Sequence, residues 1–134
     1  MNIFVIEDSL FMRIAIERIL TRAGHTVTGF ADGREGLQAA RINPPALILL
    51  DMMLPGLDGT SVLKALKDDA TTAQIPVIVL TGLSQRNEAK LKSAGAAAYI
   101  EKSSLDLDQN AEGLIESIDA VLRDPVAMSG LSPA

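Results

Sequence analysis

Short apolar runs alternate along the chain with segments in which apolar residues recur every three or four positions. The runs lie between turn-forming residues, which is typical of strands, and the spacing in the other segments is that of amphipathic helices. Two runs, ALILL and PVIVL, are unbroken, as expected for strands covered on both faces of a parallel sheet. The predicted strands are residues 1–6, 26–30, 46–50, 76–80 and 97–100, and the apolar positions of the predicted helices fall within 12–23, 34–42, 62–66, 89–94 and 114–122.

Polar residues and glycines mark the ends of the predicted helices. Ser9 is expected to cap the first helix, and Gly24 is expected to end it. Asp32 marks the turn into the second helix, and Ser84 is expected to cap the fourth. These local signals support the order of elements and leave the fold within a broad class.

The order is strand then helix, five times over, with short connections. It predicts an α/β protein with a parallel sheet, helices on both faces and right-handed crossovers. A length of 134 residues suits a single domain. We assign residues 1–124 to this domain. Residues 125–134 lack periodicity and are expected to form a flexible C-terminal tail or the start of a linker.

Composition excludes several classes of function. The absence of cysteine rules out disulfides, thiolate metal sites and cysteine catalysis. A net charge of −5, with basic residues scattered singly, argues against direct nucleic-acid binding. No apolar run approaches the roughly 20 residues of a membrane span, and the N-terminal stretch is too short for a signal peptide. We therefore expect a soluble, cytoplasmic protein without membrane insertion.

Polar residues of specific kinds follow four of the predicted strands: Glu7 and Asp8, Asp51, Thr81, and Lys102. The carboxyl ends of parallel strands lie on one edge of the sheet, where ligands bind, so these five residues are expected to converge. Neighbouring carboxylates require a cation, and oxygen ligands without His or Cys suit Mg²⁺.

This set of side chains suits phosphoryl transfer. Asp51 is ionised at neutral pH and could attack phosphorus without a general base. Mg²⁺ and Lys102 would cancel charge on the phosphoryl oxygens, and Thr81 would donate a hydrogen bond.

Four motifs in register resemble the receiver domain of response regulators, from the chemotaxis-regulator-like superfamily of two-component signal transduction. They are Glu7-Asp8, the stretch D-x-x-L-P-G-x-D-G that begins at Asp51, Thr81-Gly82, and the stretch A-G-A-x-x-Y-I-x-K that ends at Lys102. The match covers about residues 2–123. The resemblance implies a flavodoxin-like (βα)5 fold, a doubly wound five-stranded parallel sheet in the order 2-1-3-4-5.

The resemblance also implies the roles of the acids. Asp51 would be the phospho-acceptor, and a histidine kinase or a histidine phosphotransfer protein would be the donor. Glu7, Asp8, Asp51 and the backbone carbonyl of Met53 would bind Mg²⁺. Such a chain is not an enzyme in the ordinary sense, because it accepts a phosphoryl group and hydrolyses only its own.

The resemblance further implies a switch. Thr81 and Lys102 would bind the phosphoryl group, and Tyr99 would turn inward when Thr81 moves. The surface around the fourth helix, the fifth strand and the last helix would then bind an unknown downstream protein. The chain would be a monomer or a weak dimer through that surface. The resemblance places Met53 and Leu83 at positions that flank the phosphoryl group in the family. Because both side chains are apolar, we expect the phosphoaspartate to hydrolyse slowly.

One residue departs from the family pattern. The family usually has proline after the lysine, often with a cis bond, whereas this chain has Ser103. A cis bond before a non-proline residue costs about 2.5–4 kcal/mol. Either the site tolerates that strain or Lys102 approaches along a trans backbone. Residues 103–110 also form a longer approach to the last helix than is usual in the family.

Three alternatives accompany this interpretation. The first is a degenerate receiver that serves only as a docking or dimerisation module, without phosphorylation. The second is a small phosphohydrolase, whose familiar design has a second acid where this chain has Met53. The third is a flavin-binding protein, which would need more aromatic residues than the 3% present. His25 is expected to be a surface loop residue without a chemical role.

Overall fold

The computed structural model describes residues 1–54, 59–81, 95–102 and 112–123. Several predictions lie outside these residues. They are the fourth helix with its cap Ser84, the residue Leu83, the bond between Lys102 and Ser103, and the C-terminal tail.

Strands and helices alternate in the predicted order. The strands and helices of the described residues are β1 (Asn2–Ile6), α1 (Leu10–Arg22), β2 (Thr26–Phe30), α2 (Gly33–Ile42), β3 (Leu47–Asp51), α3 (Gly59–Asp68), β4 (Val77–Thr81), β5 (Ala98–Glu101) and α5 (Glu112–Arg123). Each strand lies within one or two residues of its predicted place. The two unbroken apolar runs became β3 and β4, which are buried at every position.

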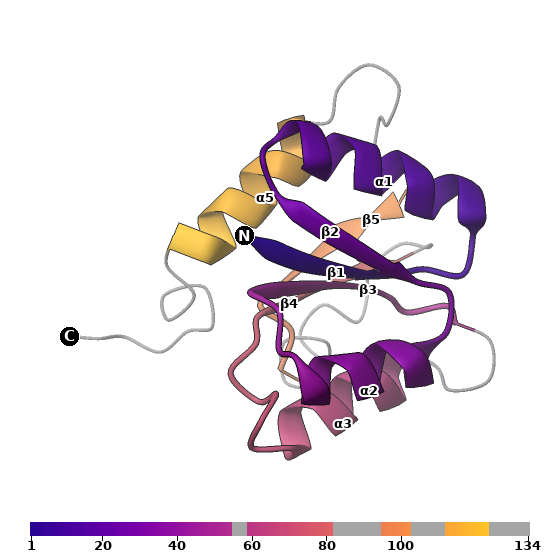
Figure 1. Ribbon diagram of the computed structural model, residues 1–134, viewed down its shortest axis with the longest axis vertical. Helices are drawn as coiled ribbons and strands as arrows, with labels where there is room; N and C mark the ends of the chain where they lie inside the picture. The colour runs from indigo at the N-terminus through magenta and orange to yellow at the C-terminus, as the bar shows by residue number, and fades with distance from the viewer. Residues whose placement is uncertain (55–58, 82–94, 103–111, 124–134) are drawn as a thin grey trace.

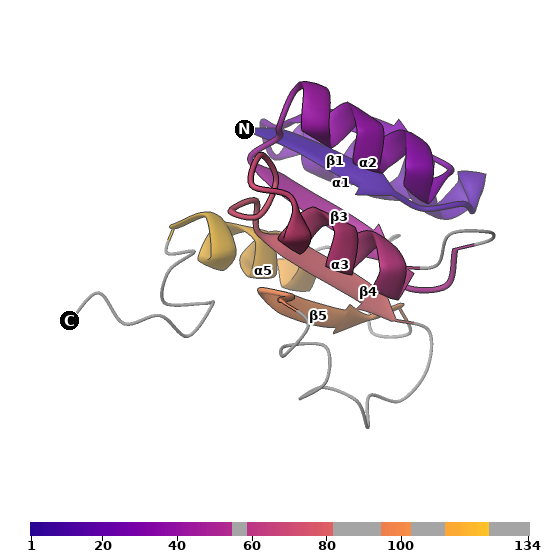
Figure 2. The ribbon, with the colours of Figure 1, turned by 90° about the horizontal axis from the view of Figure 1, so that it is seen from below.

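The five strands form one parallel sheet in the order β2-β1-β3-β4-β5. Helices α1 and α5 cover one face, and α2 and α3 cover the other (Figures 1 and 2). The doubly wound fold and the strand order 2-1-3-4-5 are therefore confirmed. None of the described helices is both long and apolar enough to cross a membrane.

Three local signals read from the sequence are confirmed. The Ser9 hydroxyl accepts a hydrogen bond from the Met12 N–H at 3.3 Å and caps α1. The Asp32 carboxylate accepts one from the Arg34 N–H at 2.7 Å and caps α2. Gly24 follows α1 with a φ of +97°, a conformation that favours glycine.

Strand alternation divides the core into two clusters, one on each face of the sheet. The α1/α5 cluster contains Ile3 and Val5 of β1 together with apolar residues of α1 and α5. The α2/α3 cluster contains Phe4 and Ile6 of β1 together with apolar residues of α2 and α3. Because side chains alternate along a strand, the same rule sets the face toward which a residue at a strand end points.

Candidate functional site

Three charged residues at the carboxyl edge of the sheet share one face. Glu7, Asp51 and Lys102 come from the ends of β1, β3 and β5. Each lies two residues after a strand residue that packs on the α1/α5 cluster, namely Val5, Leu49 and Ile100. The period-two pleat therefore brings residues that are far apart in the sequence to the same side of the same edge.

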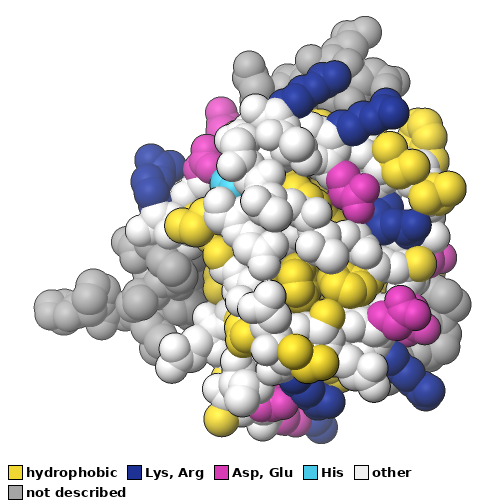
Figure 3. Space-filling model, in the orientation of Figure 1, with side chains coloured by type: hydrophobic (Ala, Val, Ile, Leu, Met, Phe, Trp, Pro, Cys, Tyr) yellow, Lys and Arg dark blue, Asp and Glu magenta, His cyan; other side chains and the backbone are white. Residues whose placement is uncertain are grey.

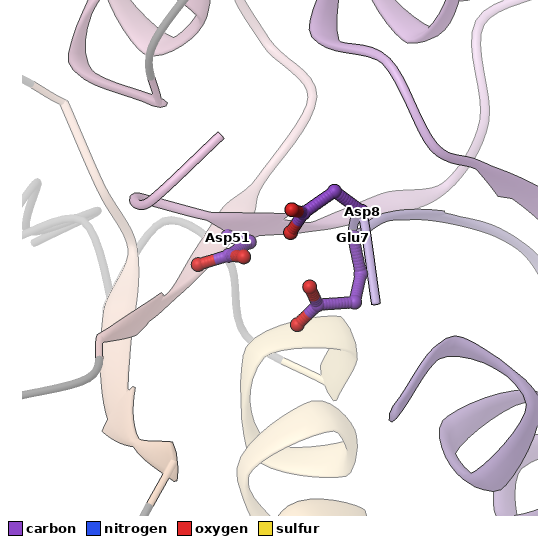
Figure 4. A group of neighbouring side chains, drawn as sticks. All are labelled: Glu7, Asp8 and Asp51. Atoms are coloured by element: carbon purple, nitrogen blue, oxygen red, sulfur yellow. The ribbon is translucent and has the colours of Figure 1, made fainter. Parts of the chain in front are cut away.

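The acids form a compact group. Glu7, Asp8 and Asp51 each offer a carboxylate oxygen, and these oxygens lie within 4.8 Å of one another (Figure 4). Glu7 and Asp51 are fully buried, whereas Asp8 is exposed at the mouth of the group. The backbone holds the two buried acids. The Ser9 N–H donates to Glu7 Oε2 at 3.1 Å, and the Met53 N–H donates to Asp51 Oδ1 at 2.9 Å.

Lys102 lies between the two buried acids. Its Nζ is 2.8 Å from Glu7 Oε1 and 2.9 Å from Asp51 Oδ2. Burial raises the pKa of Glu7 to about 7, while Lys102 lowers that pKa and Asp51 raises it to a smaller extent. Burial alone would lower the pKa of Lys102, but pairing with Glu7 and Asp51 outweighs burial and raises it. The ammonium is thus held in its charged form beside the acceptor candidate.

The donor set fits a divalent cation. With all three carboxylates ionised, Lys102 compensates one negative charge and leaves two. Every ligand atom offered is a hard oxygen, as Mg²⁺ prefers, and neither His nor Cys belongs to the group. Asp8 is open to the solvent from which an ion would arrive. Glu7, Asp8 and Asp51 could therefore hold Mg²⁺.

Thr81 and Tyr99 belong to the face that carries α2 and α3. Tyr99 packs on the α2/α3 cluster and pairs in register with Val79, two residues before Thr81. Thr81 is 5% exposed, and its hydroxyl donates to the Ile100 carbonyl of β5 at 3.3 Å. Thr81 therefore lies at the same edge as Asp51, with its hydroxyl bonded to the neighbouring strand.

Met53 lies at the rim of the site. Its side chain is 68% exposed, although its N–H is bonded to Asp51. The predicted ligand role of the Met53 carbonyl stays a prediction, as does the role of Leu83.

Two residues near the site were not singled out from the sequence. A Cβ on Gly59 would lie 2.4 Å from the Met52 Cα and 2.6 Å from the Asp51 carbonyl oxygen, so only glycine fits at the start of α3. The side chain of Arg13 reaches from α1 to the Glu7 carbonyl oxygen at 2.8 Å. The D-G pair at 58–59 could have indicated Gly59, whereas nothing in the sequence distinguishes Arg13 from the other arginines of the helix.

Comparison with known proteins places these features in a family. The model of the response regulator receiver domain matches residues 3–112. The chain is 37% identical over 123 residues to the transcriptional regulatory protein CseB of Streptomyces avermitilis, covering 91% of this chain and 49% of CseB. It is 33% identical over 122 residues to protein PilH of Pseudomonas aeruginosa, covering 90% of this chain and 97% of PilH.

Solved structures agree with the sequence relatives. The receiver domain of the Francisella response regulator 1452 superposes with a TM-score of 0.81 at 26% identity, covering 92% of this chain and 98% of that one. The receiver domain of the sensor histidine kinase PA1611 of Pseudomonas aeruginosa, a structure with a magnesium ion coordinated in the active site cleft, gives a TM-score of 0.79 at 25% identity, covering 91% and 97%. The chain spans about half the length of the first curated relatives that it matches. This chain belongs to the response regulator receiver domain family.

Proposed function

We propose that this receiver domain is a phosphorylation switch in which Asp51 accepts a phosphoryl group with the help of Mg²⁺. One observation carries the proposal. Asp51 is buried, has the Lys102 ammonium 2.9 Å from Oδ2, and lies with two further carboxylates inside 4.8 Å. The PA1611 receiver domain, whose structure contains a magnesium ion in its active site cleft, supports the choice of cation.

The donor would be a phosphorylated histidine of a histidine kinase or of a histidine phosphotransfer protein. An Asp51 carboxylate oxygen forms the new O–P bond while the P–N bond to the donor breaks, and the imidazole nitrogen keeps the electron pair and takes up a proton. Mg²⁺, when bound, would neutralise charge on the phosphoryl oxygens. Lys102 remains charged beside Asp51 and stabilises the product, while the Met53 N–H orients the carboxylate.

An apolar surface beside the site suits the docking of that donor. Leu10, Phe11 and Ile14 of α1 are 60%, 75% and 38% exposed, and they lie two, three and six residues after Asp8 in the chain. Figure 3 shows hydrophobic side chains gathered over this end of α1. Large exposed apolar side chains that cluster on a helix commonly mark a protein-binding site. We place the donor there because its histidine must reach Asp51.

The output would follow from Thr81. If the Thr81 hydroxyl turned to a phosphoryl group on Asp51, β5 would lose the hydrogen bond from Thr81 to the Ile100 carbonyl, next to Tyr99. The surface formed by the predicted fourth helix, β5 and α5 would then bind a downstream protein or a second copy of the chain. The protein would act in the cytoplasm, bind no nucleic acid directly, and catalyse only its own dephosphorylation.

Intact-mass spectrometry tests the proposal. The protein is incubated with acetyl phosphate, with and without Mg²⁺, as wild type and as Asp51→Asn. We expect a single phosphoryl adduct on the wild type that requires Mg²⁺, and none on Asp51→Asn. A folded wild-type protein that takes up no phosphoryl group under these conditions would contradict the proposal. That result would favour a docking module without phosphorylation.

A further inference from the structure

Arg13 of helix α1 makes a hydrogen bond to the loop that follows β1 and contains Glu7, Asp8 and Ser9. Its Nη1 donates to the backbone carbonyl of Glu7 at 2.8 Å. That carbonyl belongs to the peptide bond that joins Glu7 to Asp8. The direction of this peptide decides how Asp8 leaves the end of β1, so Arg13 acts on both acids without touching either carboxylate.

Two further hydrogen bonds hold this loop in place. The Glu7 N–H donates to the Phe30 carbonyl of β2 at 2.9 Å, and the Ser9 N–H donates to the Glu7 carboxylate at 3.1 Å. Arg13 therefore supplies the contact to the one backbone group of Glu7 that the neighbouring strand does not hold.

A glycine in β2 makes room for this contact. α1 packs against β1 and β2 (Figure 1). A Cβ on Gly29 would lie 2.9 Å from the Arg13 Cδ, 3.1 Å from its Cγ, and 2.0 Å from the Glu17 Oε1. The stem of Arg13 thus crosses β2 directly over the position where any other residue would carry a side chain. Gly29 pairs in register with Val5, which places this crossing beside β1, the strand that ends one residue before Glu7.

We propose that Arg13, seated over Gly29, is a positioning residue that sets the geometry of Glu7 and Asp8 for Mg²⁺ binding. The proposal rests on the Mg²⁺ site of the proposed function and adds a residue outside the ligand set. Partners that orient metal ligands without touching the ion commonly contribute tenfold or more to metal affinity.

The sign of the effect separates positioning from simple charge. Arg13 is a cation next to an acidic group, so its removal should strengthen Mg²⁺ binding if charge alone mattered. Loss of positioning should weaken binding instead. The two explanations predict opposite changes in the same dissociation constant.

The test is isothermal titration calorimetry of Mg²⁺ on the full chain as wild type, Arg13→Gln, Gly29→Ala and Arg18→Gln. Arg18→Gln is the matched control, because it removes the same charge from an exposed position on the same helix. Gly29→Ala keeps every charge and displaces the Arg13 stem together with the Glu17 carboxylate. Thermal unfolding of each variant establishes that the chain is folded at the temperature of the titration.

We expect Arg13→Gln to weaken Mg²⁺ binding about tenfold, Gly29→Ala to weaken it in the same direction, and Arg18→Gln to leave it close to wild type. Binding that is unchanged or tighter in folded Arg13→Gln would overturn the inference while leaving the proposed function intact. A wild-type protein that binds no Mg²⁺ would overturn both.

Discussion

At the scale of single residues, the most unusual group is Glu7. Its carboxyl is fully buried beside a second carboxylate, and burial raises its pKa to about 7. The Lys102 ammonium lies between the two acids. Glu7 is therefore half protonated near neutral pH in the absence of a cation, and a bound cation would displace that proton.

Mg²⁺ binding should depend on pH through Glu7. Below about pH 7 the protonated carboxyl lacks the charge that a cation requires, so the Mg²⁺ affinity should fall about tenfold for each pH unit. Above about pH 8 the affinity should become constant. Calorimetric titrations at pH 6, 7 and 8 measure this dependence, and an affinity that did not change between pH 6 and 8 would contradict the protonated state of Glu7.

The same group should affect stability in metal-free solution. The folded-state pKa of Glu7 lies above its ordinary value of 4.5, so the contribution of Glu7 to stability is present below about pH 4.5 and is lost as the pH rises through about 7. Glu7→Gln should therefore raise the unfolding temperature at pH 8 and change it little at pH 5. The comparison serves as a control for the metal titrations.

The lifetime of the phosphorylated form should depend on the residue at position 53. The Met53 side chain is exposed at the rim of the site, and a thioether cannot orient an attacking water molecule. Met53→Asn should therefore speed the loss of the phosphoryl group several-fold, whereas Met53→Leu should leave the rate near that of wild type. The decay is followed by intact mass after removal of acetyl phosphate, and an unchanged rate in Met53→Asn would show that this side chain does not control hydrolysis.

At the scale of elements, the sequence predicts each strand of the sheet and the polar residues at the strand ends, because both signals are local. Ser9 and Gly24 delimit α1 for the same reason. The position of Lys102 between Glu7 and Asp51 depends on how three strands align across the sheet, and no local pattern contains that information. The contacts of Arg13 and Gly59 likewise depend on the approach of two elements that are separate in the chain.

The start of α3 should tolerate no side chain. Gly59→Ala places a Cβ against the backbone of Asp51 and Met52, and neither backbone can move without shifting the end of β3. We expect a loss of roughly 2 kcal/mol or more in the free energy of unfolding. Gly113→Ala is the matched control, because its Cβ would meet nothing within 4 Å, and it should not lower the free energy of unfolding. Chemical denaturation of both variants measures the difference, and equal stabilities would contradict the close contact.

The exposed end of α1 should matter for a protein donor and not for a small one. Phe11→Ala removes the most exposed of the three apolar side chains beside the site and leaves the acids untouched. We expect phosphorylation by acetyl phosphate to be unchanged and phosphotransfer from the cognate histidine donor to slow about tenfold or more. Rates from the two donors on the same variant provide the comparison. A protein donor that phosphorylates Phe11→Ala at the wild-type rate would place its docking surface elsewhere.

At the scale of the whole molecule, the fold is a means of bringing distant side chains to one edge. A parallel sheet directs the ends of β1, β3, β4 and β5 toward the same edge, and the pleat assigns their side chains to two faces. Glu7, Asp51 and Lys102 lie on the α1/α5 side, whereas Tyr99 packs on the α2/α3 side. Thr81, bonded to β5, connects the edge to that second side. This arrangement connects a change at Asp51 to the surface at β5 that we propose for partner binding.

We propose that the phosphoryl group is carried by Asp51 and by no other acid of the site. The most direct test is reduction of the acetyl-phosphate-treated protein with borohydride, which converts a phosphorylated aspartate into homoserine, followed by peptide mass spectrometry. We expect the reduced residue at position 51, only in samples that contained Mg²⁺. Homoserine at position 8, or reduction of another acid such as Glu7 to its own alcohol, with position 51 unmodified, would contradict this assignment.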